Sequence, residues 1–89
     1  MLNTCRDFIV ELLKEVSPDT ADGIIKGFDL PVKLKNTLID YYVNGLGVKE
    51  IADKYSVDDR TVKRWFADAY KKAAEHVKNS IRLHYSSLL

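Results

Sequence analysis

Residues 45–66 read GLGVKEIADKYSVDDRTVKRWF, and this stretch decides the fold that we predict for the chain. It holds two short helical patterns joined by about three residues, which is how a helix-turn-helix looks in sequence. Ala52 is the most informative position, because a side chain much larger than methyl there would push the crossing helices apart. We expect the apolar seam between the two helices to consist of Ile51, Ala52, Tyr55, Val57, Val62, Trp65 and Phe66.

The second helical pattern of this stretch has the features of a DNA-reading helix. Asp58 is placed to cap it by accepting hydrogen bonds from the backbone amides near Arg60 and Thr61. The side chains that point away from the seam are Asp59, Arg60, Lys63, Arg64 and Ala67. Arginine can bind guanine edges with two hydrogen bonds, and lysine can approach a guanine or a phosphate. Asp59 and Asp68 put negative charge on or near the same face, so docking on a protein stays an alternative.

The rest of the chain reads as helices separated by proline and glycine, with no convincing strand pattern. Residues 17–19 (Ser-Pro-Asp) and 29–31 (Asp-Leu-Pro) are both helix start signals, and Gly27 and Gly45 are stop signals. Apolar stripes at helical spacing are Phe8, Ile9, Leu12, Leu13 and Val16 in the first helix and Leu34, Leu38, Ile39, Tyr42 and Val43 in the third. The predicted fold class is all-α, with a three-helix helix-turn-helix core (residues 30–74), an N-terminal helical segment (residues 1–29) and a helical extension (residues 75–89).

Composition limits the classes of protein to which the chain can belong. With 89 residues and 46% hydrophobic content it supports one domain. The lone Cys5 and the lack of an apolar run of about 18 residues favour a soluble, cytoplasmic protein without a membrane span. His76 and His84 are too far apart on one helix to share a metal ion. We expect no metal, no cofactor and no catalytic residues, and therefore no enzyme.

Net charge is only +1, but its distribution along the chain is uneven. Acidic residues outnumber basic ones in residues 1–29, and basic residues outnumber acidic ones in residues 58–89. The basic charge therefore collects on the candidate reading helix and its continuation. Binding to a polyanion through this part of the chain should be modest and salt-sensitive.

From Leu30 to about Ala74 the chain resembles region 4 of bacterial sigma factors. The resemblance rests on Leu30-Pro31, on the interval to Gly45, on the triplet at residues 50–52 (Glu-Ile-Ala) and on the triplet at residues 61–63 (Thr-Val-Lys). In that family the second helix of the motif enters the major groove of the promoter, and the surrounding helices contact RNA polymerase. The resemblance implies double-stranded DNA and RNA polymerase as partners. Carried over by position, the DNA-binding residues would be Lys49, Arg60, Thr61, Lys63 and Arg64, with Lys49 near the DNA backbone.

The last predicted helix is longer than a minimal three-helix core needs, since Ala69, Ala73, Val77 and Ile81 continue its apolar stripe. Two partners for this stripe are open. The first helix of the same chain would give a compact five-helix domain, whereas the same surface of a second subunit would give a homodimer that presents two reading helices. We favour the homodimer.

The function that we predict is a small sequence-specific transcription regulator that reads the major groove with the helix from about Asp59. A sigma region 4-like adaptor that binds RNA polymerase is one alternative. The DNA-recognition subunit of a phage or mobile-element machine is another, because a helix-turn-helix there is joined to an oligomerising helix.

Overall fold

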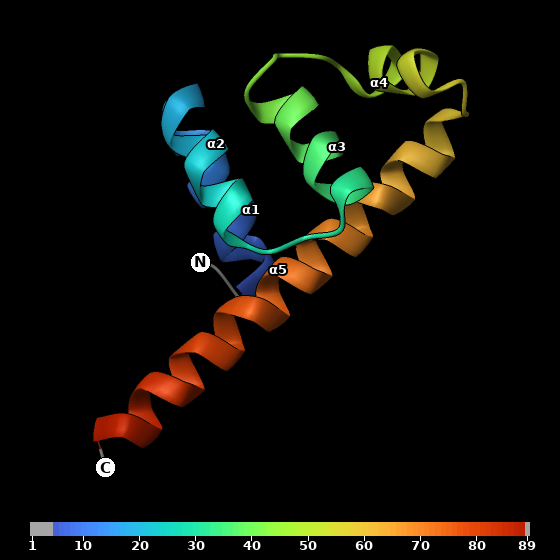
Figure 1. The fold of residues 1–89 in the computed structure, drawn as a ribbon. Coiled ribbons are helices and arrows are strands. Elements are labelled where there is room, and N and C mark those ends of the chain that lie inside the picture. The colour runs from blue at the N-terminus through green and yellow to red at the C-terminus, as the bar shows by residue number, and fades with distance from the viewer. Residues whose placement is uncertain (1–4, 89) are drawn as a thin grey trace.

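The computed structural model describes the backbone of residues 5–88 and the side chains of residues 6–79. Within these bounds the chain is all-helical, as predicted, with α1 (Cys5–Glu15), α2 (Pro18–Gly27), α3 (Val32–Tyr42), α4 (Val48–Tyr55) and α5 (Asp59–Leu88). Helices α1 to α4 lie along one side of the long α5 (Figure 1). The helix bounds agree with the sequence patterns to within a few residues, and α5 continues as one helix past Ser80.

The two predicted helix start signals behave differently. Ser17 caps α2 as expected, because its Oγ accepts a hydrogen bond of 3.3 Å from the Thr20 amide. Asp29 does not start α3 in the same way, so that prediction is wrong. Its backbone is left-handed (φ 56°), and the residue that precedes α3 is Pro31, which has no side-chain acceptor. The first amides of α3 therefore lack a side-chain cap.

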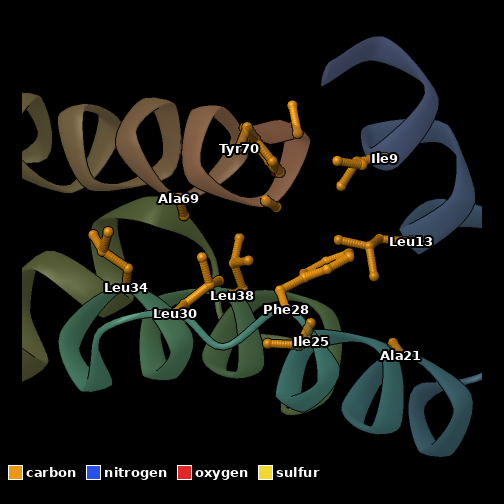
Figure 2. Close-up of a cluster of buried hydrophobic side chains, with 12 residues drawn as sticks. Ile9, Leu13, Ala21, Ile25, Phe28, Leu30, Leu34, Leu38, Ala69 and Tyr70 are labelled. Atoms are coloured by element: carbon orange, nitrogen blue, oxygen red, sulfur yellow. The ribbon is translucent and has the colours of Figure 1, made fainter. Parts of the chain in front are cut away.

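Most of the buried side chains form one cluster, which we call the larger core. Figure 2 shows it between α5 on one side and α2 and α3 on the other, with α1 closing one end. Its members are Ile9, Leu13, Ala21, Ile25, Phe28, Leu30, Leu34, Leu38, Ala69, Tyr70, Ala73 and Ala74. Ile25, Leu38, Ala69 and Ala73 are fully shielded from solvent. Small alanines on α5 let the other helices approach its backbone closely.

Helix α1 packs against α5 of the same chain, so the first helix is one partner of the apolar stripe of the long last helix. Ile9 and Leu13 are buried in the larger core, and Val77 of α5 packs against it. Phe8, which the sequence pattern assigns to the same stripe, is 49% exposed, because Ile9 and Leu13 occupy the face of α1 that meets α5. The side chain of Ile81 lies outside the described residues.

A pair of tyrosines crosses the larger core between α3 and α5. The hydroxyls of Tyr42 and Tyr70 share a hydrogen bond. Burial raises the pKa of both phenols above the ordinary value, so both stay protonated at neutral pH. The Arg6 guanidinium lies 5.9 Å from the centre of the Tyr70 ring and tethers the start of α1 to α5.

Candidate nucleic-acid interface

The loop between α3 and α4 fixes where α4 begins. Gly45 has a positive φ of 74°, which glycine adopts without steric cost, and the Leu46 amide donates to the Asp40 carbonyl oxygen over 2.9 Å. The Glu50 carboxylate accepts a hydrogen bond of 3.2 Å from the Gly47 amide. This contact also places a negative charge at the positive end of α4, where it is stabilising.

The turn between α4 and α5 begins at Ser56. Its backbone is left-handed (φ 56°, ψ 46°), and the Val57 amide donates to the Ala52 carbonyl oxygen over 2.9 Å. This is the usual way in which a helix ends, and glycine is the residue that adopts it most readily. Serine at this position carries some steric strain, which the surrounding contacts offset.

Between α4 and α5 lies a second, small apolar cluster, which we call the seam cluster. Its buried members are Ile51, Ala52 and Val62, and none is more than 2% exposed. Partly buried side chains packed against it are Leu46, Val48, Tyr55, Val57, Trp65 and Phe66. All seven residues of the predicted seam therefore belong to this cluster or pack on it. Trp65 and Phe66 also pack on the larger core, so they join the two clusters.

The start of α5 is fixed by Asp58. Its Oδ1 accepts hydrogen bonds from the Thr61 amide at 2.9 Å and from the Thr61 hydroxyl at 2.7 Å. These two bonds, the hydroxyl one first, hold the pKa of the Asp58 carboxyl below its ordinary value. The Thr61 hydroxyl proton is therefore used within the chain, and only the oxygen lone pairs remain to face a partner.

Three basic side chains occupy the first two turns of α5. Arg60, Lys63 and Arg64 are exposed, and so is Lys49 in the first turn of α4. Thr61, the fifth residue of the predicted DNA-binding set, is half-buried. Because α4 and α5 are held together by the seam cluster, these positions belong to one packed unit even though Lys49 lies on a different helix.

Asp59 and Asp68, the two acidic residues near this surface, are also exposed. Asp59 occupies the first turn of α5, where a carboxylate favours the positive helix end. Asp68 borders a shallow groove of about 440 Å³ between α5 and the start of α1, together with Arg6 and Lys71. Glu75 and Lys78 line the same groove, so its charged side chains are of both signs.

A buried carboxylate that the sequence reasoning missed connects α3 to α4. Asp40 is 3% exposed. Its Oδ1 accepts from Lys54 Nζ at 2.8 Å and from Asn44 Nδ2 at 3.3 Å, and its Oδ2 accepts from the Tyr55 hydroxyl at 2.9 Å. We call this group the Asp40 clamp. Burial alone would raise the pKa of Asp40, but the hydrogen bonds from Lys54, Tyr55 and Asn44 outweigh it, and the pKa lies below its ordinary value.

The sequence offers only a weak signal for the Asp40 clamp. Thr37, Asp40 and Asn44 recur at helical spacing beside the apolar stripe of α3, but a solvated helix face shows the same pattern. A second missed contact is Lys33 of α3, whose ammonium group lies 5.1 Å from the centre of the Trp65 ring. Both contacts depend on how separate helices pack against each other, which the pattern within one helix does not reveal.

The described residues contain no group of three His, Cys, Asp or Glu side chains that could hold a metal ion. In the same part of the chain, no helix combines the length and apolar character that crossing a membrane requires. Comparison with protein-family models, with curated proteins and with solved structures finds no match to this chain.

Proposed function

We propose that α3, α4 and α5 form a helix-turn-helix core and that the protein is a small transcription regulator that reads double-stranded DNA. The observation that carries this proposal is the exposed trio Arg60, Lys63 and Arg64 on the first two turns of α5. A DNA-reading helix needs basic donors at its N-terminal end and a rigid support behind it. The seam cluster and the Asp58 cap are supports of this kind.

Each basic side chain has a proposed role that follows from its chemistry. Arg60 and Arg64 read guanine edges in the major groove, because a guanidinium can donate two parallel hydrogen bonds to the O6 and N7 atoms. Lys63 contacts a guanine or a phosphate. Lys49, at the positive end of α4, contacts the phosphate backbone on the flank of the groove. Thr61 contributes mainly through the cap, and its oxygen can accept from a partner.

Selection from a random duplex library with the full chain, followed by fluorescence anisotropy at several salt concentrations, tests this proposal. We expect a preferred sequence and an affinity that falls as salt rises. Arg64→Ala should reduce the preference at one or two base pairs, at a cost of about 1–3 kcal/mol. Lys49→Ala should weaken binding to all sequences equally and reduce the salt slope by about 1.

The matched control for these variants is Lys14→Ala with Lys26→Ala, which removes exposed positive charge from α1 and α2. The control should bind as the original chain does. If no duplex binds even at low salt, or if Arg60→Ala with Lys63→Ala behaves like the control, the proposal is wrong.

A second candidate function is a protein-binding adaptor that docks on RNA polymerase. The exposed carboxylates of Asp59 and Asp68 favour it, because an unpaired carboxylate costs affinity for a polyanion unless it accepts from a cytosine amine. Pull-down of purified polymerase without DNA separates the two functions. Retention that depends on Asp59 and Asp68, and not on Arg60 and Arg64, would favour the adaptor.

A further inference from the structure

The C-terminal end of α5 projects beyond the other helices. Helix α5 spans Asp59–Leu88, which at about 1.5 Å per residue is roughly 45 Å. The longest dimension of the molecule is 49 Å, so α5 sets its length. In Figure 1 none of α1 to α4 lies beside the last turns of α5. We call residues 78–88 the projecting segment.

The projecting segment has an amphipathic sequence. Val77 packs on the larger core, and Ile81, His84 and Leu88 follow it at spacings of four, three and four residues. This is the spacing at which one face of a helix meets another helix. Residues 76–89 contain Lys78 and Arg82 and no aspartate or glutamate. The segment continues a long helix, so its helical form does not depend on a partner, but an apolar face flanked by basic residues favours contact with an apolar surface that has an acidic rim.

The surface of α1 that faces away from α5 has the complementary character. Phe8 is 49% exposed, and Phe8 and Leu12 line a shallow trough of about 280 Å³ together with Glu11 and Glu15. We call these four residues the α1 trough. Glu11 and Lys14 form a long surface ion pair of 3.8 Å, which contributes little and can be exchanged for another partner. The trough therefore combines exposed apolar area with an acidic rim.

We infer that the chain forms a symmetric homodimer in which the projecting segment of each copy packs on the α1 trough of the other. Both complementary surfaces lie on one chain. Lys78, the first residue of the projecting segment, lines a groove with Arg6 of the same copy, and beyond it α5 runs past the start of α1 (Figure 1). The described lining of the α1 trough comes from α1 alone, so the trough is open to the projecting segment of a second copy. The exchange is reciprocal, so a two-fold axis closes the assembly and no open surface is left for further addition. The dimer does not depend on the proposed DNA binding, and either can fail alone.

Charge reversal on the full chain tests the pairing of the two surfaces. One variant carries Glu11→Lys with Glu15→Lys, and the other carries Lys78→Glu with Arg82→Glu. In each variant alone the two surfaces have like charge, so we expect the dimer dissociation constant in analytical ultracentrifugation to rise at least about tenfold. In an equimolar mixture both contacts of a heterodimer pair opposite charges, so the mixture should dimerise like the original chain.

The matched control is Asp19→Lys with Asp53→Lys, which reverses two exposed acidic residues on α2 and α4 and should leave the dimer unchanged. Circular dichroism checks that each variant is folded. If a variant does not fold, a mixed-isotope sample of the original chain replaces it, with NMR contacts expected between α1 of one copy and the projecting segment of the other. A monomer at all concentrations, a larger ring, or variants that do not recover on mixing would overturn the inference.

Discussion

The larger core and the seam cluster hold their helices in different ways. The larger core buries large side chains from α1, α2, α3 and α5, whereas the seam cluster buries only Ile51, Ala52 and Val62. Helix α4 compensates with polar contacts, because the Asp40 clamp ties its last turn to α3. The placement of α4 therefore depends on a few buried apolar side chains and one buried charge, whereas α5 is also held by the larger core. Substitutions in the two regions should therefore differ in how much they lower the free energy of unfolding and in which helices they affect.

The largest effect is expected in the larger core. Leu38→Ala removes a fully buried side chain between α3 and α5 and should lower the free energy of unfolding by about 3–4 kcal/mol. Urea denaturation followed by circular dichroism measures it. Val32→Ala, on the same helix but 66% exposed, should change the stability by less than about 0.5 kcal/mol. Equal effects from the two substitutions would contradict this account of the core.

The next effect should be confined to the seam cluster. Ala52→Leu inserts extra methylenes between α4 and α5 at a position that is 2% exposed, and should cost about 1–3 kcal/mol. Hydrogen exchange should accelerate most at amides of α4, with smaller changes in α1 and α2. Lys72→Leu, an exposed substitution on α5, is the control and should leave exchange unchanged. Uniform acceleration along the chain would mean that the two clusters are one cooperative unit.

The contribution of the Asp40 clamp to the stability of the fold should depend on pH. The folded-state pKa of Asp40 lies below its unfolded value, so on acidification the unfolded chain takes up the proton first. Its contribution is therefore complete above about pH 4, the ordinary range of an aspartate, and is lost as the pH falls through the folded-state pKa. Asp40→Asn should cost about 1–2 kcal/mol at pH 7, and the difference from the original chain should shrink under acid.

Asp53→Asn is the control for the clamp, because Asp53 is an exposed aspartate on the same helix as Lys54. Denaturation curves for both variants at several pH values between about 2 and 7 make the comparison. If the cost of Asp40→Asn is the same at every pH, the clamp does not depend on the charge of Asp40.

The smallest effect is a gain in stability at the two left-handed residues. Asp29 and Ser56 both have φ of 56°, one between α2 and α3 and one between α4 and α5. Ser56→Gly should stabilise the fold by about 0.5–1 kcal/mol, because glycine adopts this conformation without a steric cost. Asp29→Gly should gain less, since aspartate tolerates the left-handed region better than serine does. Thermal denaturation compares the two variants, and a larger gain at Asp29 would contradict this ranking.

The sequence predicts the helices well because each apolar stripe and each stop signal is local. Gly45 adopts the positive φ that its position suggests, and Ser17 caps α2 as its pattern requires. The exposure of Phe8 could not be predicted, since the first helix offers two adjacent apolar faces and only packing on α5 selects one. The Asp40 clamp joins residues of α3 and α4 across a loop, so no periodicity within one helix reveals it. The basic surface of α5 follows from helical spacing, but its ligand does not.

The uninterrupted course of α5 has a geometric consequence. One helix runs from the basic residues Arg60, Lys63 and Arg64 to the end of the projecting segment, without a glycine or proline at which the helix could bend. The angular phase between the two ends is therefore set by the number of residues between them, at about 100° for each residue. A single inserted residue near Asn79 would rotate the basic surface by about that angle relative to the projecting segment, whereas four would return it close to its original phase and displace it by about 6 Å.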